Sequence, residues 1–112
     1  MRLIGGNSAS SGRVELSIGG NWGTICHNKW TKHDADVICR SLGYQNAYMA
    51  TVGSVFGPGN GRIVLDNVEC LGNESSILQC KHGGLGSVTC TVEQEAGVFC
   101  EKPNSKFLIY PL

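Results

Sequence analysis

Six cysteines and three histidines carry most of the chemistry that this chain can offer. The cysteines stand at positions 26, 39, 70, 80, 90 and 100, with gaps of 13, 31, 10, 10 and 10 residues. Zinc sites and thioredoxin-like redox centres use cysteine pairs only two to four residues apart, so this spacing argues against both. A cysteine nucleophile with a histidine base is a further alternative, yet no local motif marks any thiol as activated by His27, His33 or His82. We therefore expect three disulfides, which are typical of proteins outside the cytosol.

The energetic weight of such bridges depends on the loops that they close. Six cysteines allow fifteen pairings, and spacing alone does not choose among them. A bridge that closes some sixty residues restrains the unfolded chain by about 4 kcal/mol. This is comparable to the net stability of a small domain, so the loss of one long-range bridge is expected to abolish folding.

Length and charge restrict the remaining classes of function. A chain of 112 residues accommodates one domain. Nine Lys and Arg balance nine Asp and Glu, so the chain lacks the basic field that drives binding to nucleic acids or anionic membranes. No apolar run approaches the roughly 20 residues of a membrane helix, so we expect no direct membrane insertion. Sixteen glycines favour many turns over a helical bundle.

A hairpin is the first element that must position the cysteines. Val14, Leu16 and Ile18 alternate with polar residues, which is the pattern of a strand with one buried face. Gly19-Gly20 supplies the chemistry of a tight turn, and residues 21–26 are the expected return strand.

A helix is predicted to follow, because Thr31 and Asp34 have the spacing of an N-cap and its partner. Gly43 is placed to end it in a left-handed conformation. One apolar stripe runs along it, formed by Ala35, Ile38, Cys39 and Leu42. Since Cys39 lies on this buried stripe, its disulfide partner is expected in the sheet beneath the helix. Asp34 and Asp36 are interpreted as carboxylates that compensate the helix dipole on a solvated face.

The other segments are shorter. Residues 47–61 are expected to form a glycine-rich loop, and 57–61 lacks the Lys-Ser/Thr of a phosphate-binding loop. Strands are predicted over 63–68 and 96–100, one helical turn over 75–78, and a loop at 83–86. Residues 102–112 form a tail that is either an added edge strand or the linker to a further module.

Five segments, in this order, resemble the scavenger receptor cysteine-rich (SRCR) domain: residues 12–16 (GRVEL), 22–26 (WGTIC), 36–44 (DVICRSLGY), 65–70 (LDNVEC) and 95–100 (EAGVFC). The resemblance implies an α+β fold in which a curved antiparallel β-sheet cradles one main α-helix. It covers residues 1–101 as one domain and leaves 102–112 as a tail or linker. Six cysteines place the chain with group A of the family, whose pairing implies the bridges Cys26–Cys90, Cys39–Cys100 and Cys70–Cys80.

The resemblance also implies a function. SRCR domains are non-catalytic, extracellular ligand- or protein-binding modules, here expected to be excised from a larger secreted or membrane-anchored receptor. The alternative is an accessory domain that positions a substrate or partner in a mosaic extracellular enzyme, such as a serine protease or a lysyl-oxidase-like amine oxidase. The implied partner is an extracellular protein or a surface polyanion, and no enzymatic activity is expected.

Many SRCR domains hold calcium in a cluster of acidic residues, and this chain departs from that cluster. His27-Asn28 replaces its first Asp pair, and Asp66-Asn67 and Gln94-Glu95 each keep one acid of two. Asp66, Asn67 and Glu95 are thus the residual metal-ligand candidates. Because calcium needs several oxygen ligands, we expect its binding to be weak or absent, and no other cofactor is implied.

Five further expectations concern individual side chains and loops. Basic residues are scattered in sequence, so we interpret them as dispersed for solubility and not as a polyanion site. His27 is interpreted as a solvated loop histidine, and Trp22 and Trp30 as packing residues. Residues 49–60 and 83–88 are the loops expected to carry recognition. Asn73-Glu74-Ser75 is an N-glycosylation sequon, with Asn73 as the candidate acceptor.

Overall fold

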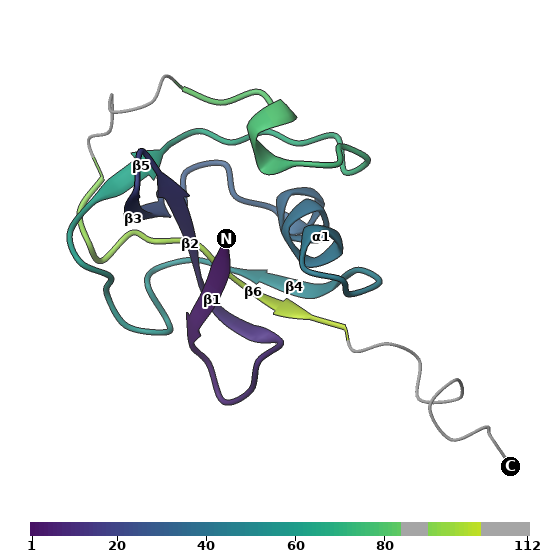
Figure 1. Cartoon of the computed structure of the whole chain (residues 1–112), viewed down its shortest axis with the longest axis horizontal. Coiled ribbons are helices and arrows are strands. Elements are labelled where there is room, and N and C mark those ends of the chain that lie inside the picture. The colour runs from purple at the N-terminus through teal and green to yellow at the C-terminus, as the bar shows by residue number, and fades with distance from the viewer. Residues whose placement is uncertain (84–89, 102–112) are drawn as a thin grey trace, which may run out of the picture.

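One mixed sheet and one α-helix make up the domain (Figure 1). The computed structural model describes residues 1–83 and 90–101. The strand order is β4-β6-β2-β3-β5, with β1 pairing separately with β2. The elements in chain order are β1 (Arg2–Gly5), β2 (Ser11–Ile18), β3 (Asn21–Ile25), α1 (Lys32–Ser41), β4 (Ala47–Thr51), β5 (Ile63–Leu65), the single 3-10 turn η1 (Ile77–Gln79) and β6 (Gly97–Cys100). The expected α+β fold is confirmed.

The β2–β3 hairpin forms where the sequence predicts it. Ile18 pairs with Asn21 at the end of the ladder, which leaves Gly19 and Gly20 as the turn. Their φ angles are 63° and 83°, a conformation that glycine adopts without the steric penalty of a Cβ atom. Val14 and Leu16 are buried beneath the helix side of the sheet, as the alternation indicates.

Helix α1 also has the predicted ends. Thr31 is the N-cap, and Gly43 follows the C-cap with φ of 96°. Ala35, Ile38 and Cys39 are fully buried, so the predicted stripe is the face that packs on the sheet.

Three disulfides connect the layers. Cys39–Cys100 joins the buried face of α1 to β6, with 5.5 Å between the two Cα atoms. Cys26–Cys90 joins the end of β3 to the segment before β6, and Cys70–Cys80 closes the loop that contains η1. These are the three pairs that the family resemblance implies.

The structure differs from the sequence-based expectations in four places. Residues 47–61 are not all loop, because 47–51 form β4; Tyr48 and Met49 are both exposed at a bulge, so strand alternation is hidden. Strand β1 was not expected at all. The strand predicted over 63–68 ends at Leu65 and pairs in parallel with β3, so the sheet is not wholly antiparallel. The turn predicted over 75–78 lies at 77–79. The tail at 102–112 and the predicted loop at 83–86, except for Gly83, lie outside the described residues.

The disulfide pairing is open to a direct test by peptide mapping under non-reducing conditions. Trypsin separates the cysteines into four peptides, and cleavage after glutamate at Glu74 and Glu93 then divides Cys70 from Cys80 and Cys90 from Cys100. We expect linked peptides that correspond to 26–90, 39–100 and 70–80 alone. A Cys26–Cys39 linkage, or any free thiol in the folded protein, would contradict the assignment.

Candidate binding surface

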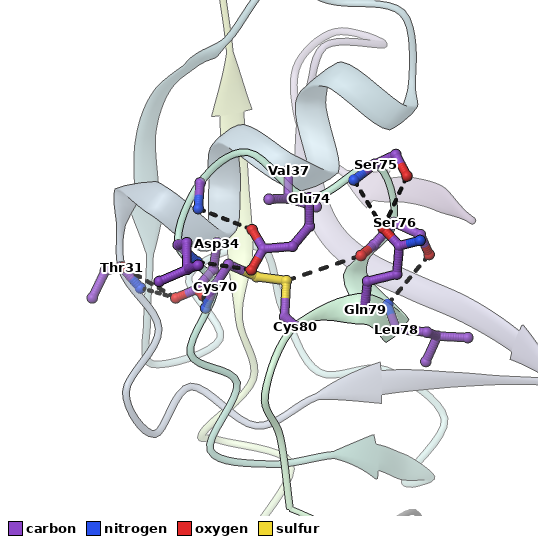
Figure 2. The surroundings of a disulfide bond; sticks show 12 residues. Thr31, Asp34, Val37, Cys70, Glu74, Ser75, Ser76, Leu78, Gln79 and Cys80 are labelled. Atoms are coloured by element: carbon purple, nitrogen blue, oxygen red, sulfur yellow. Dashed lines mark hydrogen bonds between the residues drawn. A yellow bond between two sulfur atoms is a disulfide. The ribbon is translucent and has the colours of Figure 1, made fainter.

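The Asp34 carboxylate connects α1 to the disulfide loop that follows β5 (Figure 2). Its Oδ2 accepts the Thr31 backbone N–H at 2.6 Å, and its Oδ1 accepts the Cys70 backbone N–H at 2.7 Å. Asp34 is fully buried. The expectation that it lies on a solvated face is therefore wrong: burial raises the pKa of Asp34 above its ordinary 3.8, against the lowering effect of the bonded N–H groups.

Asp34→Asn should destabilise the folded domain. An amide keeps one acceptor oxygen but turns an NH2 group toward the other backbone N–H, which leaves that donor buried without a partner. We expect a loss of about 2–3 kcal/mol in the free energy of unfolding, measured by denaturant titration at pH 7. Glu93→Gln is the matched control, because Glu93 is exposed, and it should leave the stability unchanged. Equal stability of both variants would show that the bridge between α1 and Cys70 is unimportant.

Glu95 is likewise an internal residue and not a free ligand. It is 1% exposed, and its two carboxylate oxygens accept the Thr24 hydroxyl and the Gly59 backbone N–H, each at 2.7 Å. This bond pattern fixes the residue 52–60 segment against the sheet. The sequence identifies Glu95 only as a residual calcium ligand. Its role as an internal hydrogen-bond acceptor is not visible there, because its two donors lie 71 and 36 residues away in the chain.

The calcium candidates do not form a calcium site. Asp66 is buried, and its Oδ1 accepts the Asn67 backbone N–H at 2.7 Å. Within the described residues, two groups of three side chains bring possible metal-ligand atoms close together: Cys26, Asp66 and Cys90, and Cys70, Glu74 and Cys80. Both groups contain two cysteines that are joined in a disulfide, and neither group contains Glu95. Because calcium takes six to eight oxygens, this donor set does not fit the ion.

We therefore predict that low-millimolar calcium leaves the melting temperature unchanged, because Glu95 is buried with both carboxylate oxygens in hydrogen bonds and the acidic pairs of the family's cluster are incomplete. The measurement is a calcium titration followed by thermal unfolding, with magnesium at the same ionic strength as control. A rise of several degrees with calcium alone would contradict this prediction.

The basic side chains are occupied within the described part of the chain. Glu15, itself buried, accepts hydrogen bonds from both Arg2 and Arg13. Arg2 also lies 3.8 Å above the Trp22 ring. The others pair with acids or carbonyl groups: Lys32 with Asp36, Lys29 and Lys81 with Glu69, Arg40 with Gly72 and Glu74, and Arg62 with Ile18. Lys102 and Lys106 lie outside the described residues. Within the described residues, each of these basic side chains therefore has an acidic or carbonyl partner in the domain.

Exposed apolar side chains gather instead on β4, on the segment after it and on β6. We call this set the β4–β6 apolar face; it consists of Tyr48, Met49, Val52, Val55 and Phe99, which are 68%, 44%, 49%, 62% and 36% exposed. Met49 pairs directly with Phe99 across the two strands. The neighbouring Val98 and Cys100 point to the core and to α1, so Met49 and Phe99 lie on the opposite face of the sheet.

The segment that carries Val52 and Val55 is held by hydrogen bonds on several sides. The Gly53 N–H donates to Nδ1 of His27 at 2.8 Å in a solvent-exposed contact, and His27 itself is half-buried. The Ser54 hydroxyl donates to the Val92 carbonyl, and Arg13 donates to the Gly57 carbonyl. A segment held in this way loses little conformational entropy when a partner binds.

These features define a small, disulfide-braced extracellular recognition domain. The chain belongs to the SRCR family: the family model described as the scavenger receptor cysteine-rich domain matches residues 4–101. The resemblance drawn from the five segments is thereby confirmed.

Relatives and solved structures agree with this family. The chain is 53% identical over 100 residues to galectin-3-binding protein of Rattus norvegicus and 47% identical over 112 residues to that of Mus musculus. The matched residues make up 89% and 100% of this chain, but only 17% and 19% of the rat and mouse proteins, respectively. The third SRCR domain of murine neurotrypsin superposes with a TM-score of 0.83 at 43% identity, over 91% of this chain and 95% of that one.

The dimeric form of the SRCR domain of mouse MARCO superposes with a TM-score of 0.77 at 40% identity, over 90% of this chain and 94% of that one. SRCR domains of these relatives are extracellular binding modules, and this chain is an extracellular domain of the same kind. None of the helices in the described residues is long and apolar enough to cross a membrane.

Proposed function

We propose that this domain is a non-catalytic module that binds an extracellular protein through the β4–β6 apolar face. The observation that carries the proposal is a set of exposed apolar side chains on β4, on β6 and on the segment after β4. Met49 and Phe99 pair across the two strands, and the segment is fixed by Glu95, His27 and Arg13. Exposed apolar groups on a rigid scaffold are typical of protein-binding surfaces.

A protein partner agrees better with this surface than a polyanion does. Polyanion binding depends on free Lys and Arg, whereas the described basic side chains pair with acids or carbonyl groups of the domain. The names of the curated relatives supply the first partner to test, since they are galectin-3-binding proteins. We therefore propose galectin-3 as the first candidate protein.

A second role is favoured by one comparison. The likeness to the third SRCR domain of murine neurotrypsin supports a module that works beside other domains in a longer chain. In that role the same face would position a partner for a neighbouring catalytic domain. The residues that flank this chain in its gene distinguish the two roles, because a protease or oxidase domain would be recognisable there.

Removing the apolar side chains should weaken binding to galectin-3 immobilised on a biosensor. We expect the double variant Tyr48→Ser/Met49→Ser to lose at least about tenfold in affinity, since apolar anchors dominate such interfaces. Leu71→Ser is the matched control: Leu71 is 80% exposed but lies in the disulfide loop, so the variant should bind as the wild type does.

Two outcomes would overturn parts of this proposal. Equal loss in the Leu71 variant, or none in the double variant, would exclude the β4–β6 apolar face as the binding site. An unmodified domain that ignores galectin-3 would exclude that partner. In a parallel measurement, retention on a heparin column above physiological salt would favour a polyanion ligand over a protein.

A further inference from the structure

The loop closed by Cys70–Cys80 holds the sequon Asn73-Glu74-Ser75, which is the single N-x-S/T motif of the sequence. Such motifs arise by chance, so their structural setting decides whether they can be modified. In this loop Asn73 is exposed and lies directly after a bend at Gly72, between the disulfide and η1.

The fold does not use the side chain of Asn73. Asparagines in loops often cap turns, and Asn60 does so here: its Oδ1 accepts the Arg62 N–H and its Nδ2 donates to the Trp22 carbonyl. In the 70–80 loop the turn is capped by Glu74 instead. Its carboxylate accepts hydrogen bonds from the N–H groups of Leu71 and Gly72 at 2.9 and 3.0 Å (Figure 2). The described residues form no hydrogen bond to the Asn73 carboxamide, so its Nδ2 is available.

The backbone on both sides of Asn73 is fixed from the helix. Arg40 donates from Nη2 to the carbonyls of Gly72 and Glu74, and the Ser41 hydroxyl donates to the Ser75 carbonyl. The N–H bonds to Glu74 hold its pKa below the ordinary 4.5, so this brace is charged at neutral pH. Asn73 is therefore presented outward on a supported bend, with the Ser75 hydroxyl exposed beside it and bonded to Gln79.

We propose that Asn73 carries an N-linked glycan in the secreted protein. In this transfer Asn73 Nδ2 forms a bond to the anomeric carbon of a lipid-linked oligosaccharide, and the bond from that carbon to the pyrophosphate oxygen breaks. The lipid pyrophosphate leaves with the electron pair, and the amide nitrogen gives up one proton. The lipid-linked oligosaccharide of the secretory pathway is the only co-reactant.

The position of this glycan separates it from the β4–β6 apolar face. Helix α1 packs on β4 and β6 with one side and on η1 with another, and Figure 1 shows α1 between the green η1 loop and these strands. Met49 and Phe99 lie on the face of the sheet that is turned away from α1. A glycan on Asn73 would thus cover the end of the domain that exposes Leu71 and Leu78, and leave the apolar face open.

The test is secretion of the full chain, fused to a cleavable leader, from a eukaryotic host. Intact mass and release by peptide-N-glycosidase in heavy-oxygen water then report the occupancy of each asparagine. We expect one glycan on the wild type, located at Asn73. Ser75→Thr keeps the sequon and should keep the glycan, whereas Asn73→Gln and Ser75→Ala should lose it.

Folding is controlled in the same experiment. Because the fold does not use the Asn73 side chain, the Asn73→Gln variant made in bacteria and refolded should melt at the temperature of the unglycosylated wild type. A secreted, folded wild type that lacks a glycan would overturn the proposal. So would a glycan that persists in both Asn73→Gln and Ser75→Ala.

Discussion

The covalent link between α1 and β6 is the constraint on which the rest of this domain depends. Cys39 and Cys100 are 61 residues apart in sequence, and a bridge of that span removes about 4 kcal/mol of conformational freedom from the unfolded chain. β6 pairs with β4 on one side and with β2 on the other, so the link fixes the helix over β4 and β6, at one end of the strand order. A domain of this size buries only a thin core, and the bridge supplies what apolar burial alone does not.

Buried carboxylates add further connections between segments that the disulfides do not join. Asp34 joins α1 to Cys70, Glu95 joins the 52–60 segment to β3, and Glu15 on β2 binds Arg2 of β1 and Arg13 of β2. Each of these acids accepts hydrogen bonds from N–H, hydroxyl or guanidinium donors, which is the condition under which a buried charge is tolerated. These acids therefore act within the domain as internal connections between segments that are distant in the chain.

The local elements and the family were predictable, and the long-range connections were not. The alternation of Val14, Leu16 and Ile18, the double glycine, and the spacing from Thr31 to Gly43 are all short-range signals, and the structure confirms the hairpin and the helix. Asp34 shows the limit: its capping role follows from its distance to Thr31, but its bond to Cys70 depends on a segment 36 residues away. β4 was missed for a related reason, because a bulge exposes two successive residues and erases the period of two. The β4–β6 apolar face could not be predicted, because it depends on the pairing of Met49 with Phe99, and no local sequence pattern indicates that these two residues are neighbours.

The separation of the two ends of the domain follows from the same architecture. One face of the sheet packs against α1, and the 52–60 segment covers part of the other face, where Met49 and Phe99 remain partly exposed. The opposite end consists of a short loop that is closed by one disulfide and braced by Arg40, and its exposed asparagine has no role in folding. A glycan on Asn73, as proposed, would lie on the η1 side of α1, and α1 lies between the η1 loop and strands β4 and β6 (Figure 1). Glycosylation and the proposed recognition would then use side chains from different parts of the domain.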